Sequence, residues 1–331
     1  EQHRDQRIDG AGFRALAGIV RENEVRDGKA MSGWMQERIQ VSGRLTLTGG
    51  LRLEKYDYSR HILCQPVSGI PAEVDIRRGD RVFQPIPGVG ATFQPAGPLT
   101  VFAGVHRGFA PPRVKDAITR SGLSLELDAE RSWNYETGLR LRLRDLRLES
   151  TFFTTDFQNQ IIPASESGGA TSTLVNAGRT LHRGVELAGA FSRRGILAEA
   201  RHTWLPAARF SSGIYAGDRL PYAPEHNLSV LLGYRHRRGF SVHLDGARVG
   251  DQFGDNRQTR AGSPDGTVGL LPAYWVWNLS AGREFSRERF TMSPFVSIKN
   301  LADRIYISSR APQGIQPGMF RQVNAGIKFR F

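Results

Sequence analysis

The last residues of the chain alternate between apolar and polar side chains. Every second position back from the C-terminus is apolar: Phe331, Phe329, Ile327, Ala325 and Val323. The positions between them are polar, small or cationic: Arg330, Lys328, Gly326, Asn324 and Gln322. Successive side chains of a β-strand point to opposite faces, so residues 320–331 are predicted to form a strand with one apolar and one polar face.

The same alternation recurs along most of the chain. Residues 131–143 are a clear case, with Trp133, Tyr135 and Leu139 on one face and Asn134, Glu136 and Arg140 on the other. We predict further strands over 31–41, 44–57, 82–94, 99–107, 146–157, 180–191, 196–209, 225–236, 239–250, 273–285 and 289–300. Residues 11–22 fit a strand or a short helix. The total is roughly 13 strands, or 14 with this segment.

The connections between these strands alternate in length. Within each pair they are short, on the order of two to five residues. Between pairs they are long and rich in Gly, Pro, Ser, Asp and Arg: 58–81, 108–130, 158–179, 210–224, 251–272 and 301–319. Outer-membrane barrels place short turns on the periplasmic side and long loops outside the cell. The pattern therefore predicts an all-β fold, an antiparallel transmembrane β-barrel, with the long loops extracellular.

Composition agrees with a barrel and excludes other membrane architectures. Of 331 residues, 39% are hydrophobic, and the mean hydropathy is -0.38. No apolar run approaches the roughly 20 residues of a transmembrane helix. Strands that alternate between lipid and lumen average to a polar composition, so a barrel remains possible. The single cysteine, Cys64, rules out an internal disulfide bond and a cysteine-based zinc site.

The formal net charge of +13 suggests an anionic partner or simply a solvated basic surface. Nucleic acid is not favoured, because no nucleic-acid-binding signature is present and many cations fall on the polar face of a strand. An enzyme is not favoured either. The chain has no G-x-S-x-G, P-loop or zinc signature, and the histidines are scattered. A passive pore and a surface hydrolase stay open as alternatives, and no cofactor is expected.

Several stretches, in order along the chain, resemble the C-terminal barrel of TonB-dependent outer-membrane siderophore receptors. They are residues 45–56 (LTLTGGLRLEKY), 101–113 (VFAGVHRGFAPPR), 133–140 (WNYETGLR), 150–162 (STFFTTDFQNQII), 176–187 (NAGRTLHRGVEL), 220–226 (LPYAPEH) and 296–306 (VSIKNLADRIY). The G-F-A-P-P-R motif and residues 318–331 are similar to receptors of the ferric citrate type. The ending G-x-x-F-x-F, with Gly326, Phe329 and Phe331, resembles the signal that the barrel assembly machinery reads.

The resemblance implies energised uptake of a ferric siderophore or citrate chelate across the outer membrane of a Gram-negative bacterium. It implies the TonB complex, the barrel assembly machinery, outer-membrane lipid and lipopolysaccharide as partners, with iron present only in the transported chelate. Such receptors carry an N-terminal plug in a 22-stranded barrel. The chain begins at Glu1 and matches neither plug nor TonB box, so residues 1–331 are expected to be a partial barrel domain, with 1–30 uncertain as strand or loop.

Arginines in the loops and at the rim are the candidate ligand-binding residues. Their planar guanidinium groups donate paired hydrogen bonds to carboxylates, which an iron citrate complex carries. A glutamine can add neutral donors. The predicted set is Arg107, Arg113, Arg120, Arg179, Arg219, Arg257, Arg310 and Gln313. The alternative for any one of them is a solvated side chain or a contact with anionic lipopolysaccharide.

Overall fold

The computed structural model describes residues 2–9, 19–67, 70–111, 118, 129–158, 161–162, 175–176, 178–288, 290–311 and 314–331. Regular structure in these residues consists of β-strands. None of their segments forms a helix long and apolar enough to span a membrane. The predicted fold class is confirmed: the chain is all-β, and the strand pairs of the described sheet are antiparallel.

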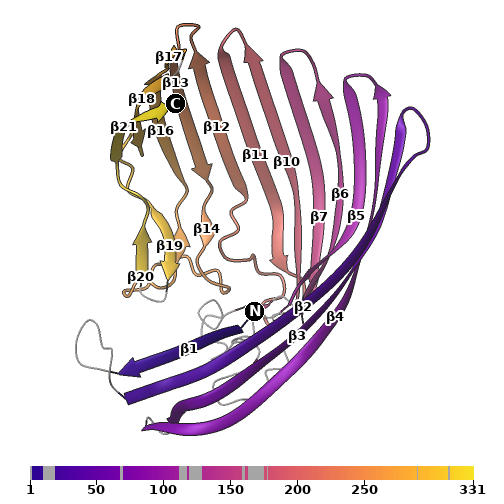
Figure 1. The fold of residues 1–331 in the computed structure, drawn as a ribbon, viewed down its shortest axis with the longest axis vertical. Helices are drawn as coiled ribbons and strands as arrows, with labels where there is room; N and C mark the ends of the chain where they lie inside the picture. The colour runs from indigo at the N-terminus through magenta and orange to yellow at the C-terminus, as the bar shows by residue number, and fades with distance from the viewer. Residues whose placement is uncertain are drawn as a thin grey trace.

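The described strands build one 15-stranded sheet that curves like the wall of an open barrel (Figure 1). Its order follows the sequence, so each long strand pairs with the next one along the chain. The strands are β1 (Gln2–Asp9), β2 (Ile19–Gln40), β3 (Leu45–Val67), β4 (Ile70–Ala96), β5 (Leu99–Ala110), β6 (Glu130–Arg142), β7 (Leu146–Gln158), β10 (Arg179–Arg193), β11 (Ile196–Phe210), β12 (His226–Arg235), β13 (Phe240–Val249), β16 (Tyr274–Arg283), β17 (Phe285–Arg287), β18 (Phe290–Lys299) and β21 (Gln322–Arg330).

Short turns close one end of the sheet, and the longer connections lie at the other end. Gly195 and Gly239 make two of the short turns with φ values of 85° and 81°, which a residue with a Cβ adopts only with strain. The longer connections carry small two-stranded sheets: β8 (Ile161–Ile162) with β9 (Val175–Asn176), β14 (Gln252–Phe253) with β15 (Leu270–Leu271), and β19 (Ile307–Ala311) with β20 (Gly314–Pro317).

The strand register keeps the two predicted faces continuous from strand to strand. On β6 and β7, Thr137 lies opposite Phe152 and Leu139 opposite Ser150, while Glu136 lies opposite Phe153. On β21, Val323, Ile327 and Phe329 are all more than half exposed on the face opposite Asn324 and Lys328. We call the two sides the apolar face, which carries Thr137, Phe152 and Val323, and the polar face, which carries Glu136, Phe153 and Lys328.

The prediction of a long loop over residues 58–81 is wrong. Strands β3 and β4 continue through this segment and pair until Val67 meets Ile70. Alternate residues of β3 are buried here: Tyr58, Arg60, Ile62 and Cys64. Arg60 forms an ion pair with Glu24 of β2, so the buried side includes a cation and does not show up as an apolar stripe.

The start of the chain also differs from its predicted outline. Residues 2–9 form β1, which no predicted strand covers, and β2 begins at Ile19, near the end of the ambiguous segment 11–22. The rest of that segment lies outside the described residues. The strands predicted over 31–41 and 82–94 each begin 12 residues earlier in the structure, at Ile19 and Ile70. The other strands agree with the predicted ones to within a few residues at each end.

Candidate functional site

Three connections at the loop end pack into one unit: residues 211–225, 250–273 and 300–321. Tyr222 joins them. Its hydroxyl donates to the carbonyl of Arg310 at 2.6 Å and accepts from the Arg310 backbone N–H at 3.2 Å. Its own backbone N–H donates to the carbonyl of Phe253 at 2.9 Å. Backbone groups of two other connections are therefore fixed by one residue that the sequence analysis did not single out.

Arg310, one of the predicted ligand-binding residues, holds the loops together. Its guanidinium donates from Nη1 to the carbonyl of Gly266 at 2.9 Å and from Nη2 toward that of Leu270 at 3.4 Å. Its Nε is buried. Because two of its guanidinium nitrogens bond to the protein backbone, Arg310 anchors connection 250–273 to β19.

Arg219 has a similar structural role in connection 211–225. It donates from Nη2 to the carbonyl of Leu205 at 2.7 Å and from Nε to that of Ala223 at 2.9 Å. Burial lowers the pKa of Arg219 below its ordinary value, and the nearby carboxylates of Glu225 and Asp251 oppose that shift. The connection also packs Tyr215 and Leu220 against Ala208 and Phe210, which closes a small apolar core beside it.

Arg257 is a predicted residue whose charge is open to solvent. Its backbone N–H donates to Asp255 Oδ1 at 2.9 Å, within a turn that Thr259 also caps at 3.1 Å. The side chain is exposed, and its guanidinium has no hydrogen-bond or ion-pair partner among the described residues. Arg260 follows on the same connection, exposed and stacked over Phe253 at 5.7 Å. The loop end therefore presents two cations, Arg257 and Arg260, on a braced turn.

Arg107 and Arg179 lie on the apolar face. Arg107 is two residues beyond Val105 on β5 and stacks over Trp133 at 5.7 Å. Arg179 begins β10 and forms an ion pair with Asp156 at 2.6 Å. These two arginines are therefore on the side of the sheet opposite the polar face. Arg113, Arg120 and Gln313 lie outside the described residues.

The residues of the predicted assembly signal lie on and beside β21. Phe329 is 51% exposed and Phe331 is 98% exposed, with their rings stacked 6.4 Å apart. Gly326 is on the polar face opposite Phe295, and a Cβ at Gly326 would lie 2.9 Å from that ring. The side chains of Phe329 and Phe331 are thus exposed, whereas Gly326 has no side chain and so leaves room for the ring of Phe295.

Among the described residues, no cluster of three or more His, Cys, Asp and Glu side chains has the geometry of a metal site. His202 and His226 lie next to each other, with Nε2 of His202 3.2 Å from Nδ1 of His226. The His226 ring also stacks on Trp204, whose Nε1–H donates to Glu225 at 3.1 Å. The sequence analysis did not predict this cluster, because the residues come from two strands and meet only through the β11–β12 register.

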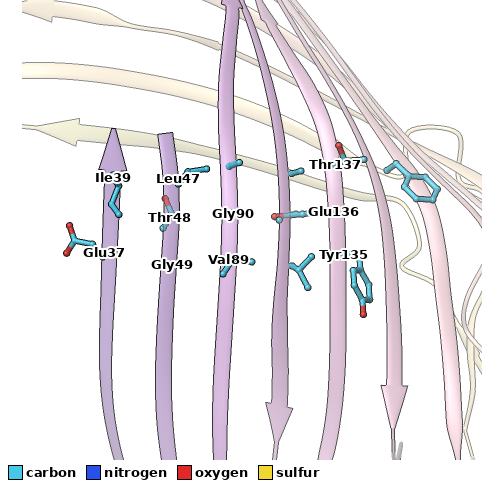
Figure 2. Close-up of a pocket in the computed structure, with 15 residues that line it drawn as sticks. Glu37, Ile39, Leu47, Thr48, Gly49, Val89, Gly90, Tyr135, Glu136 and Thr137 are labelled. Carbon is cyan, nitrogen blue, oxygen red and sulfur yellow. The ribbon is translucent and has the colours of Figure 1, made fainter. Parts of the chain in front are cut away.

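A pocket of about 750 Å³ lies on the apolar face across β2 to β7 (Figure 2). Its lining includes small residues such as Gly49, Ala91 and Ala103 and larger ones such as Val105, Tyr135 and Phe152. In the register these residues share neighbouring rows: Ala91 pairs with Ala103, and Val105 pairs with Tyr135. The pocket is therefore a groove in the apolar face and is separate from the loop arginines.

Replacing Tyr222 with Phe tests whether the loop unit is held as described. The variant leaves the Arg310 N–H and C=O without their partner, and we expect it to lower the local stability of the loops by about 1–3 kcal/mol. Hydrogen exchange at the Arg310 amide should quicken accordingly. Tyr135→Phe, on the apolar face, is the control and should leave this exchange unchanged. Equal protection in wild type and Tyr222→Phe would show that the hydroxyl does not brace the loops.

This chain is similar to known receptors and transporters in sequence and in structure. The ferric enterobactin receptor PirA of Pseudomonas aeruginosa is 26% identical over 190 residues, which cover 54% of this chain and 24% of PirA. The structure of the unliganded ferric citrate transporter FecA has a TM-score of 0.80 at 18% identity, covering 97% of this chain and 48% of that one. The yersiniabactin receptor FyuA of Yersinia pestis gives 0.75 at 21% identity, with 94% and 47% covered.

The copper transporter OprC has a TM-score of 0.74 at 17% identity, covering 98% of this chain and 52% of that one. At these identities the structural matches establish the fold alone. The chain spans about half the length of FecA, FyuA and OprC. Residues 3–301 match the family described as TonB dependent receptor-like, beta-barrel, whose members are transport receptors and not enzymes. The chain therefore belongs to the TonB-dependent receptor β-barrel family.

Proposed function

We propose that residues 1–331 are part of the barrel domain of an outer-membrane receptor that takes up a ferric chelate into a Gram-negative bacterium. Ferric citrate is the ligand we favour, and uptake in the whole protein is energised by TonB. Family membership and the strand meander support the receptor assignment. The likeness to FecA, a ferric citrate transporter, supports the choice of chelate only at the level of the shared fold.

The observation that carries this proposal is the pair of arginines on connection 250–273. The Arg257 guanidinium is exposed and unpaired within the described structure, and Arg260 is exposed three residues later. Ferric citrate presents several carboxylates and a net negative charge. Two nearby guanidinium groups bind such an anion through charge-assisted, paired hydrogen bonds.

The surrounding network explains how these arginines are positioned. Gln258, between them, donates from Nε2 to Asp218 at 2.6 Å and so ties their turn to connection 211–225. Tyr222 and Arg310 brace the same connections from the other side. A turn that is already ordered loses little conformational freedom on binding, so more of the interaction energy appears as affinity.

The proposed membrane orientation rests on the two faces of the sheet. In an outer-membrane barrel the apolar face contacts lipid and the polar face lines the lumen. Here Phe152, Leu187 and Ile327 lie on the former. On the latter, Arg140 pairs with Glu149 at 3.0 Å. Such barrels have short periplasmic turns and longer extracellular loops, so we assign connections 211–225, 250–273 and 300–321 to the extracellular side.

A double variant, Arg257→Ala with Arg260→Ala, tests the ligand proposal in the complete receptor. Each charged hydrogen bond contributes about 1.5–3 kcal/mol, so we expect ferric citrate to bind at least tenfold more weakly. Titration calorimetry with ferric citrate measures the change. The matched control is Arg237→Ala with Arg238→Ala, which removes two charges from a short turn at the opposite end and should bind as wild type. Undiminished binding by the Arg257 and Arg260 variant would rule out this site.

A further inference from the structure

Five arginines on the apolar face lie near the loop ends of strands β5, β6, β10 and β11, with β7 between β6 and β10. We call them the rim arginines: Arg107, Arg131, Arg179, Arg183 and Arg209. Their shared side follows from the register. Arg107 pairs with Trp133, and Arg131 lies two residues from Trp133 on the same side of β6. On β10, Arg179 and Arg183 share the side of Val185, and Arg209 of β11 lies opposite Leu181.

The rim arginines are poorly neutralised. Asp156 lies in the same rows and pairs with Arg179 at 2.6 Å. Arg183 and Arg209 are exposed, and neither side chain has a polar partner among the described residues. The Nε atoms of Arg107 and Arg131 are buried without a hydrogen-bond partner. A patch with this excess of positive charge favours an anionic partner.

The groove of Figure 2 is on the same face and lies farther from the loop ends than Arg107 and Arg131, which are on two of the strands that form it. Val105, which lines the groove, is two residues from Arg107, and Tyr135, which also lines it, is two residues from Trp133, the ring over which Arg107 stacks. From the loop end toward the short turns, the apolar face thus carries first the cations, then the Trp133 ring and then the apolar groove. Aromatic side chains of membrane proteins lie at headgroup level, between the charged region and the acyl chains.

We propose that the rim arginines bind the phosphate groups of a membrane lipid, one of whose acyl chains lies in the groove. Charge complementarity supports the headgroup, and the continuity of groove and patch supports a lipid over a free anion. The inference depends on the apolar face contacting lipid, but it does not depend on which chelate the receptor transports. It gives Arg107 and Arg179 a role on the outside of the barrel.

Native mass spectrometry of the complete receptor in detergent tests this proposal with dioleoyl phosphatidic acid as the probe. Arg183→Gln with Arg209→Gln changes two exposed side chains, so the fold should be kept. We expect this variant to bind the lipid about tenfold more weakly or worse, since each arginine near a membrane surface contributes comparably to anionic lipid binding. The matched control, Arg142→Gln with Arg147→Gln, removes two cations from the polar face and should bind as wild type.

Two further probes distinguish binding of the whole anionic lipid from binding of its acyl chains alone or its phosphate group alone. Dioleoyl phosphatidylcholine, which has the same chains but no net charge, should bind weakly to wild type and equally weakly to the Arg183 and Arg209 variant. Glycerol 3-phosphate, which lacks the chains, should not displace phosphatidic acid at similar concentrations. Displacement by glycerol 3-phosphate would overturn the lipid assignment, and undiminished phosphatidic acid binding by the Arg183 and Arg209 variant would overturn the proposal as a whole.

Discussion

Leu187→Arg is expected to destabilise the folded barrel by about 2–4 kcal/mol, the cost of a cation near the bilayer midplane on the lipid side of an outer-membrane strand. Leu187 is in the middle of β10, 47% exposed on the apolar face, with Ser150 and His202 as its neighbours across the sheet. Denaturant unfolding of the complete receptor in lipid vesicles, followed by tryptophan fluorescence, measures the loss.

The next residue of the same strand supplies the control. Ala188 is on the polar face, between Glu149 and Arg201 in the register. An arginine there lies beside the Glu149 carboxylate in an aqueous lumen, so Ala188→Arg should change the unfolding free energy by much less than Leu187→Arg. Equal losses for the two variants would contradict the assignment of the apolar face to lipid.

Deleting Phe331 is expected to reduce insertion into the outer membrane severalfold while leaving the inserted barrel almost as stable as wild type. Phe331 is 98% exposed, and its ring contact is with Phe329. Removing a residue with so little packing costs little folding free energy. A large loss of insertion would therefore come from recognition during assembly, as the resemblance to the barrel assembly signal implies.

Two quantities have to be measured for this deletion: the amount of receptor in the outer-membrane fraction and the unfolding free energy of the inserted part. Phe320→Ala is the control, because Phe320 is an exposed aromatic residue outside the ending. It should insert as wild type. Normal insertion of the Phe331 deletion would show that the C-terminal aromatic residue is not read as a signal.

The strands could be predicted wherever alternate side chains meet different environments. Residues 131–143 are an example, since Trp133, Tyr135 and Leu139 share one face of β6 and Asn134, Glu136 and Arg140 the other. The prediction failed at residues 58–81 because the alternation there is one of burial, not of polarity. Buried Arg60 is neutralised by Glu24, a residue more than thirty positions earlier, and no local pattern reveals such a partner.

The site could be predicted only in part, because a loop arginine looks the same in sequence whether it binds a ligand or a backbone carbonyl. Arg219 and Arg310 do the latter, and only the packed loops show it. For Arg107 a signal did exist. Val101, Ala103 and Val105 precede it at alternate positions, so the strand period places Arg107 on the apolar face.

A motif quoted for its family resemblance has a structural explanation of its own. Asn300, in the stretch 296–306, is 1% exposed with a φ of 48°. Its Nδ2 donates to the carbonyls of Arg304 and Met319 at 2.9 and 2.8 Å, and its Oδ1 accepts from the Arg304 N–H at 2.8 Å. Asparagine tolerates this backbone conformation better than most residues. The motif therefore closes the loop between β18 and β21.

The most direct test of the receptor proposal is uptake of radioactive iron supplied as ferric citrate. Cells that carry the complete receptor as their sole ferric citrate uptake system would be compared with and without TonB, after its presence in the outer membrane has been verified. We predict uptake in cells with both proteins and none when either is missing. Failure to take up ferric citrate or any other ferric chelate, despite normal insertion and intact TonB, would contradict the proposed function.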